Sequence, residues 1–249
     1  MIAFEPALAV ADAVLYEGFL LYPYTASAHK NQMRWQFGVV VPREYANAGS
    51  REPFAQQTEI LLEPEGAPAV NLLLRFLHVV SRRVEVCAEG GFEPVESLEI
   101  DGTPHVSFDE TVEREVTLRI QPLETAQSSA AIAFEGQRDE EPLRDALGNV
   151  RGRLVRERWP LRGTLVASCE PACEAPALYK FRVRVENDSD VVGAGARRSM
   201  LPAVGTRPQR SEDGRLRTAF VSAHTLLHAA GGRFVSLLDP PPAAEQATA

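Results

Sequence analysis

The sequence predicts a mainly β protein of antiparallel β-sandwich architecture, built as one or two sandwich-like halves with few short helices. Two observations lead to this fold class. Apolar and polar residues alternate with a period of two, most clearly in VEREVTLRI at 112–120 and in YKFRVRVEND at 179–188, and this is the pattern of half-buried strands. The strand-like runs are also short and are separated at regular intervals by turn-forming residues, as in sandwiches.

The first half of the chain contains a series of strand-like runs. Pro42 ends the second run because proline cannot donate to a strand ladder, and EPEGAP at 63–68 supplies a turn between the third and the fourth. The Asp101-Gly102 step, flanked by apolar residues, predicts a hairpin in the fifth. These runs are residues 13–22, 34–41, 57–63, 69–89, 98–108 and 112–120.

A polar stretch at 121–150, with the charged run RDEE, separates the two halves and is interpreted as a solvated connection. Beyond it, strands are expected at 151–168 and 179–188, then a surface loop rich in Gly, Arg and Pro at 193–215. The final unit reads as strand, Gly231-Gly232 turn, strand. The predicted organisation is an N-terminal β-sandwich-like half at 1–125, a polar connection at 126–150, a C-terminal β half at 151–240 packed on the first, and a disordered tail at 241–249.

Composition narrows the classes of partner and the compartment. The 249 residues carry a formal net charge of −8, which argues against nucleic acid as the main partner. The cysteines Cys87, Cys169 and Cys173 have no disulfide-framework spacing, so a reducing compartment is expected. The first residues lack the basic region of a signal peptide, and the apolar runs are too short to span a bilayer. We therefore expect a cytoplasmic protein without membrane insertion.

Two pairs of residues have spacings that could bind a metal. Cys169 and Cys173 lie in a proline-containing turn without the second cysteine or histidine pair that structural zinc needs. His224 and His228 would share a face of a helix, but on the strand expected here they stand about 13 Å apart, too far to share an ion. The residue after the first histidine is Thr225 rather than the glutamate of an HExxH motif. The sequence therefore predicts neither a metal site nor a bound cofactor.

A catalytic triad can be drawn from Ser222, His224 and Asp239. However, the serine lies in a predicted strand and not in the strained Gly-x-Ser-x-Gly turn that exposes a nucleophile. Phosphate-cradling loops of the Walker or dinucleotide type are also missing from the sequence. We therefore assign no catalytic residues and favour a protein that is not an enzyme.

The stretch LYPYTASAHKNQMRWQFGVVVP at 21–42 is the strongest candidate for a binding surface. It gathers aromatic and cationic side chains at the mouth of a predicted loop, and that composition is typical of binding hot spots. The alternative interpretation is that its aromatic residues, Trp35 above all, belong to the core while the polar run hydrates a turn. The candidate binding residues are Tyr22, Tyr24, Lys30, Asn31, Arg34 and Trp35.

The same stretch, LYPYTASAHKNQMRWQFGVVVP, resembles a family of uncharacterised proteins encoded beside uptake [NiFe]-hydrogenase genes, chiefly in actinobacteria. The resemblance continues in scattered blocks over most of the chain. They are FDETVEREV at 108–116, RERWPLRG at 156–163, YKFRVRVEN at 179–187 and VSAHTLLHAAGGRFVSLLDPP at 221–241. The resemblance implies an accessory role beside the hydrogenase. It assigns no catalytic residues to this chain.

The residues and the resemblance together predict a non-enzymatic accessory or scaffold protein of a [NiFe]-hydrogenase system. It would act in assembly, maturation or anchoring through contacts with hydrogenase subunits or maturation factors. Two alternatives come from other classes of protein. One is a hydrolase centred on His224 with Ser222 and Asp239, and the other is a metal or iron–sulfur carrier that uses Cys169 and Cys173.

Overall fold

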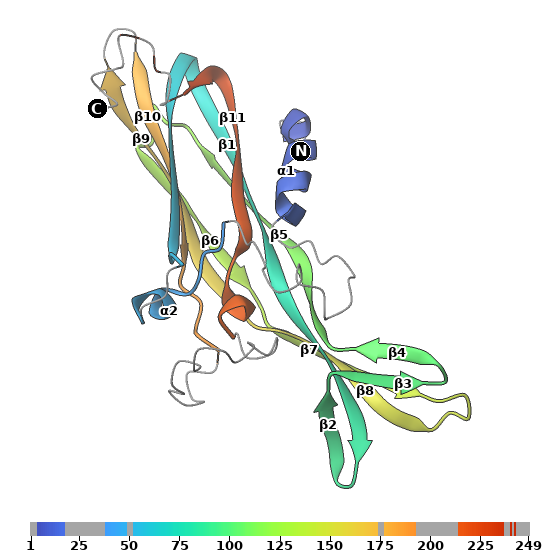
Figure 1. Ribbon diagram of the computed structural model, residues 1–249. Coiled ribbons are helices and arrows are strands. Elements are labelled where there is room, and N and C mark those ends of the chain that lie inside the picture. Colours follow the sequence, from blue (N-terminus) through green and yellow to red (C-terminus); the bar gives the residue numbers. More distant parts are fainter. Residues whose placement is uncertain are drawn as a thin grey trace.

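One long strand, β1 (Ala55–Ala88), organises the whole fold (Figure 1). It pairs antiparallel, along different parts of its length, with five other strands: β2 (Gly91–Val95), β5 (Phe108–Ile120), β8 (Val150–Arg158), β10 (Leu178–Asn187) and β11 (Val221–Val235). The structure is a computed structural model and describes residues 4–17, 38–48, 52–173, 177–192, 214–236, 240 and 242. The predicted class, a mainly β antiparallel protein with few short helices, is confirmed.

β1 and β11 bend together, and this bend makes two layers from one sheet. Their register shifts where residues 65–68 of β1 stand opposite Gly231, which has a φ of 74°. A bulge of this kind turns a strand out of the plane of its sheet. The sequence predicted separate strands on either side of 63–68 and again on either side of Gly231-Gly232. In the structure both pairs are single strands that continue through the bend.

The core of the body lies between two layers. One layer contains β5, the second part of β1 and β11, and the other contains β6 (Gln127–Phe134), β9 (Leu161–Cys173), β10 and the first part of β1. Side chains from both layers form one cluster, in which Phe76, Phe181 and Phe220 are fully buried. Burial of such large apolar side chains contributes roughly 1.5–3 kcal/mol each.

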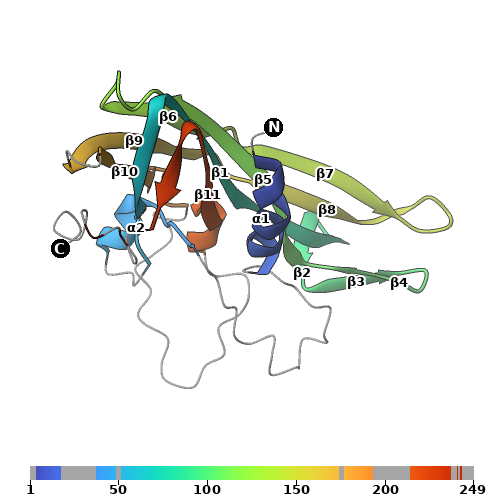
Figure 2. The ribbon, with the colours of Figure 1, turned by 90° about the horizontal axis from the view of Figure 1, so that it is seen from above.

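The far end of β1 leaves the body and forms a projecting arm, which we define as residues 81–108 and 137–158 (Figures 1 and 2). Besides β1, β2 and β8 it contains β3 (Ser97–Ile100), β4 (Thr103–Val106) and β7 (Gln137–Arg144). The β3–β4 hairpin packs on the sheet through a small second core. That core is formed by Val84, Val95, Leu98, Ile100, Leu143 and Leu154.

Residues 126–150, predicted to be a polar connection, instead contain the strands β6 and β7. β7 has almost no apolar side, because seven of its eight residues are exposed. Its side chains pair with arginines of β8 across the ladder, with Glu140 2.6 Å from Arg153 and Glu141 3.1 Å from Arg156. Opposite charges on facing strands stabilise their pairing, so a strand without hydrophobic alternation forms here.

Ion pairs join three strands of the arm into one continuous series. Each successive pair has an N···O distance between 2.6 and 3.8 Å. Starting from β1, the series runs through Arg83, Glu157, Arg138, Glu140, Arg153 and Glu85. A single exposed pair contributes little, whereas several charges in a network contribute more. Side chains therefore link the three strands of the arm in addition to the backbone pairing.

Helix α1 (Glu5–Glu17) replaces the first part of the strand predicted at 13–22. Its alanine-rich sequence favours a helix, and its Phe4, Ala11 and Leu15 side is buried against β1 and β11. The other described helices are α2 (Arg43–Asn47) and the 3-10 turn η3 (Gly214–Thr218), which stands where a strand start was expected. In the described part of the chain, no helix is long and apolar enough to cross a membrane.

Arg75 of β1 joins α1 to the sheet. Its side chain is only 5% exposed and lies 2.7 Å from Asp12 of α1, 3.2 Å from Glu113 and 3.1 Å from Glu115. Tyr16 of α1 also donates a hydrogen bond to Glu113. One guanidinium therefore bridges three carboxylates and reduces their mutual repulsion across the interface between the helix and the sheet.

Replacing Arg75 by methionine should lower the free energy of unfolding by about 2 kcal/mol. This value is below that of a fully buried pair because the carboxylates remain partly exposed. Hydrogen exchange should show α1 amides losing protection before those of β1. As a control, methionine at the exposed Arg119 of β5 should change the stability by less than about 0.5 kcal/mol. Full protection of α1 in the Arg75 variant would contradict this role.

Candidate functional site

The binding residues predicted from the sequence lie in 18–37, outside the described residues. This applies to Tyr22, Tyr24, Lys30, Asn31, Arg34 and Trp35. The described chain resumes at Gly38, whose carbonyl accepts a hydrogen bond of 2.9 Å from the Ala223 amide of β11. Gly38 has a φ of 58°, and a Cβ there would lie 2.6 Å from the Ala223 oxygen. Only glycine fits this close approach.

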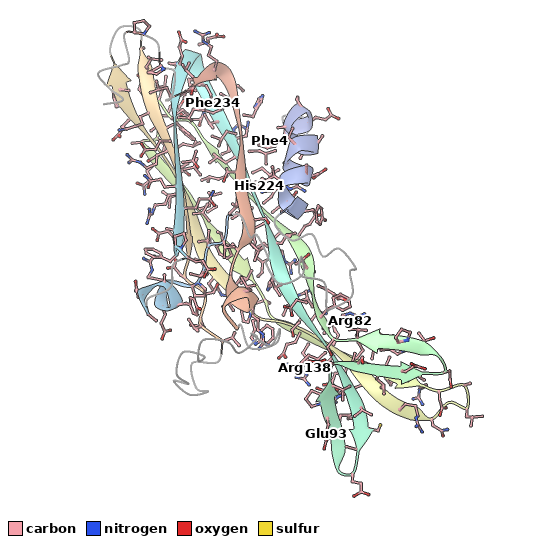
Figure 3. All side chains as sticks on the ribbon, in the orientation of Figure 1. Phe4, Arg82, Glu93, Arg138, His224 and Phe234 are labelled. Atoms are coloured by element: carbon pink, nitrogen blue, oxygen red, sulfur yellow. The ribbon has the colours of Figure 1, made fainter. Side chains whose placement is uncertain are left out.

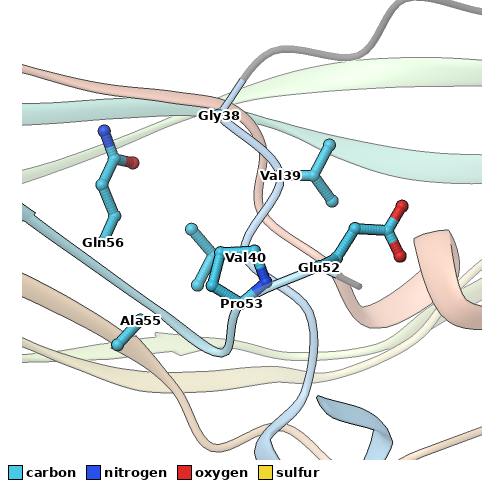
Figure 4. Close-up of a pocket in the computed structure, with 7 residues that line it drawn as sticks. All are labelled: Gly38, Val39, Val40, Glu52, Pro53, Ala55 and Gln56. Carbon is cyan, nitrogen blue, oxygen red and sulfur yellow. The ribbon is translucent and has the colours of Figure 1, made fainter. Parts of the chain in front are cut away.

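A shallow hollow of about 350 Å³ lies beside Gly38 (Figure 4). Its described lining comes from two short segments of chain, Gly38, Val39 and Val40 on one side and Glu52, Pro53, Ala55 and Gln56 on the other. Of these lining residues Glu52 alone carries an ionisable side chain. The described lining therefore does not contain a set of acid, base and nucleophile of the kind that a reaction requires.

The structure brings His224 to the backbone of Ser222 and not to its hydroxyl group. The Nδ1 atom of His224 lies 2.8 Å from the Ser222 carbonyl oxygen. The Ser222 hydroxyl has no hydrogen-bond partner among the described residues, and its residue is 2% exposed. Asp239 lies outside the described residues. A buried serine without a base on its hydroxyl does not have the geometry of an activated nucleophile.

Ser222 has a φ of 55°, which is unusual for a residue other than glycine. It lies in a bulge of β11, where the pairing with β1 shifts between Arg75 and Leu77. Because glycine removes both the backbone strain and a buried unpaired hydroxyl, Ser222→Gly should raise the free energy of unfolding by about 1 kcal/mol. Ser129→Gly in β6 is the control and should lower it. Destabilisation by Ser222→Gly, measured by denaturant unfolding, would contradict this interpretation.

The strand prediction for His224 and His228 is confirmed, since both lie in β11. They stand opposite Arg75 and Asn71 of β1. The ring of His228 also makes an edge contact with Phe4, the residue before α1, with centroids 6.4 Å apart. Figure 3 shows Phe4 and His224 on the side of β11 toward α1. Over the described residues, no group of three or more His, Cys, Asp or Glu side chains is placed to hold a metal ion.

The cysteines occupy separate environments. Cys169 of β9 belongs to the body core, and burial raises the pKa of its thiol to about 11. Its thiol is therefore protonated at neutral pH, the form that neither binds metal well nor attacks. Cys87 is exposed on the arm, with its Sγ 3.3 Å from the Val150 carbonyl oxygen. The side chain of Cys173 lies outside the described residues.

Where the body meets the arm, His78 of β1 is buried with no solvent exposure. Its Nε2 atom lies 2.9 Å from the carbonyl oxygen of Trp159, so the neutral ring donates its hydrogen there. Burial, with the nearby charges of Arg114 and Arg158, lowers the pKa of His78 to about 4. Its Nδ1 atom is buried and has no described partner. We call these four residues, His78, Arg114, Arg158 and Trp159, the waist.

Among the described residues, the two arginines of the waist have no carboxylate partner. Arg114 of β5 stacks on Phe134, with its guanidinium carbon 4.7 Å from the ring centroid. Arg158, at the end of β8, donates to the side-chain oxygen of Gln137. The Nε atoms of both are buried without a hydrogen-bond partner in the described chain. Burial and the charge of Arg158 lower the pKa of Arg114.

The arm also carries an uncompensated charge of the opposite sign. We call residues 87–107, which contain β2, β3 and β4, the acidic limb. Its carboxylates are all exposed, and Figure 3 shows Glu93 at the hairpin of the far end. Its glutamates form no ion pair with any described residue. These acidic residues are Glu89, Glu93, Glu96, Glu99 and Asp101.

Sequence reasoning missed both the waist and the acidic limb. The limb did have a signal, because no Lys or Arg occurs between Arg83 and Arg114 in a chain otherwise rich in arginine. The waist had none, since His78, Arg114 and the Arg158-Trp159 pair are far apart in the sequence and meet only through sheet pairing. Comparison of the chain with protein-family models and with curated proteins gives no match.

Proposed function

We propose that this protein is a non-enzymatic accessory or scaffold protein that works through protein–protein contacts, with partners in a [NiFe]-hydrogenase system. The choice of partner system depends on the sequence resemblance in the blocks quoted above. Action through contacts is supported by one observation above the others, the acidic limb on the projecting arm. The role is assembly, maturation or anchoring of the enzyme.

The acidic limb is unlike the other charged surfaces of the described chain. Elsewhere carboxylates commonly lie against arginines, as Glu59 does with Arg182 at 2.6 Å and Glu186 with Arg184 at 2.5 Å. On the limb the exposed glutamates form no ion pair with a described residue, and the nearby Arg153 and Arg82 contact the Phe92 ring and the Val106 carbonyl oxygen instead. A concentrated field of one sign attracts a partner of the opposite sign and orients it during encounter. The partner surface is therefore expected to be basic.

The end of the arm is held in one conformation before any partner arrives. Asp101, in the β3–β4 turn, accepts a hydrogen bond of 2.6 Å from the Ala146 amide in the β7–β8 turn. Asp145 accepts hydrogen bonds from the amides of Leu147 and Asn149 at 3.0 and 2.8 Å. Ordering costs reduce affinity, so a surface that is already ordered binds more tightly.

Large apolar side chains accompany these charges. Leu147 in the β7–β8 turn is 88% exposed, and Phe92 in β2 is 38% exposed. Exposed apolar groups at the centre of a polar surface are the usual anchors of a protein contact. The arm thus combines a steering charge with anchors, and it fits a basic protein surface that has an apolar depression.

Co-purification from a host that encodes both proteins tests the proposal. The tagged chain should retain hydrogenase subunits or a maturation factor, identified by mass spectrometry, and deleting its gene should reduce the assembled enzyme. A limb variant with Glu89, Glu93, Glu96 and Glu99 changed to Gln should lose these proteins. The control changes the exposed glutamates Glu5, Glu44, Glu65 and Glu124 to Gln, which alters the net charge equally, and should retain them. Normal hydrogenase assembly after deletion, or equal retention by both variants, would contradict the proposal.

A further inference from the structure

The waist presents an electrostatic imbalance that the fold itself does not resolve. Arg114 of β5 stands opposite Phe76 of β1, and Arg158 follows Glu157 of β8, which stands opposite Ser81. The two arginines therefore flank His78 from the strands on either side of β1. The hydrogen bond of 2.9 Å from His78 to the Trp159 carbonyl fixes the end of β8 against β1. Two guanidinium groups are therefore held near each other at the junction of body and arm.

These two arginines differ from the other half-buried arginines of the described chain. Arg75 meets three carboxylates, and Arg82 and Arg156 share Glu110 at 3.4 and 3.2 Å. Like charges that are withdrawn from water repel each other strongly and carry a desolvation penalty. The Nε atoms of Arg75 and Arg82 also lack a hydrogen bond, but carboxylates lie beside them. Arg114 and Arg158 have an unpaired Nε and no carboxylate among the described residues, and buried donors without acceptors are rare in folded proteins. These features together indicate a missing acceptor that carries negative charge.

We propose that Arg114 and Arg158 bind a small phosphate-type dianion at the waist. Two negative charges balance two guanidinium groups, and phosphate oxygens accept the Nε hydrogens that lack partners. Hydrogen phosphate suits the third unpaired atom as well, because its hydroxyl can donate to the buried Nδ1 of neutral His78. The group is either free inorganic phosphate or the terminal phosphate of a small molecule. This inference does not depend on the proposed hydrogenase association.

Titration of the purified full-length chain with inorganic phosphate at pH 7.5 tests the site, with sodium chloride holding the ionic strength constant. Nitrogen-15 spectra should show the Nε–H signals of Arg114 and Arg158 moving together and saturating at millimolar phosphate. The melting temperature should rise along the same curve. Glycerol 3-phosphate in a parallel titration separates the two sources of the group, because only an open site admits the ester.

Arg114→Met and Arg158→Met should each weaken phosphate binding about tenfold or more, since each removes a charge-assisted contact. Methionine keeps an apolar stem beside Phe134 and Trp159. The matched controls are Arg119→Met on β5 and Arg151→Met on β8, which remove exposed arginines from the same two strands and should leave binding unchanged.

A second measurement needs no ligand. Without phosphate, Arg114→Met should melt at the same temperature as the wild type or higher, because it removes the repulsion from Arg158. Three results would overturn the proposal: no saturable movement of the two arginine signals, equal phosphate binding by the waist variants and the controls, or a marked loss of stability in phosphate-free Arg114→Met.

Discussion

Replacement of Asn187 by leucine should lower the free energy of unfolding by about 3 kcal/mol. Asn187, at the end of β10, is fully buried. Its side-chain amide donates to the carbonyl oxygens of Val40 and Thr218, both at 2.8 Å, and its oxygen accepts from the Ser189 amide at 2.9 Å. Leucine has a similar volume but leaves the Thr218 oxygen and the Ser189 amide buried without this partner.

The effect should be large because Asn187 joins three segments that do not all pair with one another as strands of a sheet. These are the end of β10, the stretch that contains Val40, and the last residue of η3, Thr218. Denaturant unfolding measures the loss, and Asn47→Leu on the exposed side of α2 serves as the control. A loss below about 1 kcal/mol for Asn187→Leu would show that the three segments are held by other contacts.

Acidification from pH 6.5 to pH 4 should cost about 3 kcal/mol of stability through His78 alone. Its pKa in the folded protein is lowered to about 4 from the ordinary value of 6.5. Between pH 6.5 and pH 4 the unfolded chain binds a proton at this histidine and the folded chain does not. Stability therefore falls as pH falls. The stabilising contribution is fully present above pH 6.5 and is lost by about pH 4, where the folded ring also takes up its proton.

The contribution of His78 is isolated by subtraction, because carboxylates also titrate at the acid end of this range. In His78→Gln the side-chain amide can still donate to the Trp159 carbonyl but does not titrate. The difference in free energy of unfolding between wild type and variant should therefore shrink by about 3 kcal/mol from pH 6.5 to pH 4. Parallel pH curves for the two proteins would contradict the low pKa.

The strands that the sequence predicted best are those with one buried side. β5 and β10 alternate cleanly because one side faces the core and the other faces solvent or α1. The helix α1 was missed because its residues Ala13, Val14 and Leu15 resemble a strand, while its buried and exposed sides are both apolar. Hydrophobic periodicity cannot distinguish a helix from a strand in such a run.

β7 and the single long β1 were missed for different physical reasons. The pairing of β7 is stabilised by opposite charges, so its sequence RDEE looks like a solvated connection. The backbone does turn at 63–68 and at Gly231, as the sequence predicted. Two paired strands that bend together produce these turns as well as two hairpins would. A turn residue indicates that the backbone changes direction there. It does not indicate whether the pairing between the two strands also stops.

Candidate sites were predictable only where one segment contained the signal. Arg114 and Arg158 carry no local motif, and their proximity follows from the register of β1 with β5 and β8. The predicted loop residues, from Tyr22 to Trp35, lie outside the described residues, and their role stays a prediction. The acidic limb could have been recognised from charge patterning alone.

Photo-cross-linking in the native host tests the proposed contact surface most directly. A photoreactive amino acid replaces Glu93 or Glu99 on the acidic limb, or Glu44 or Glu124 on the body, one position at a time. The limb positions should give covalent adducts with a hydrogenase subunit or maturation factor, and the body positions should give none. Adducts with these proteins from the body positions, and none from the limb, would contradict the assignment of the arm as the binding surface.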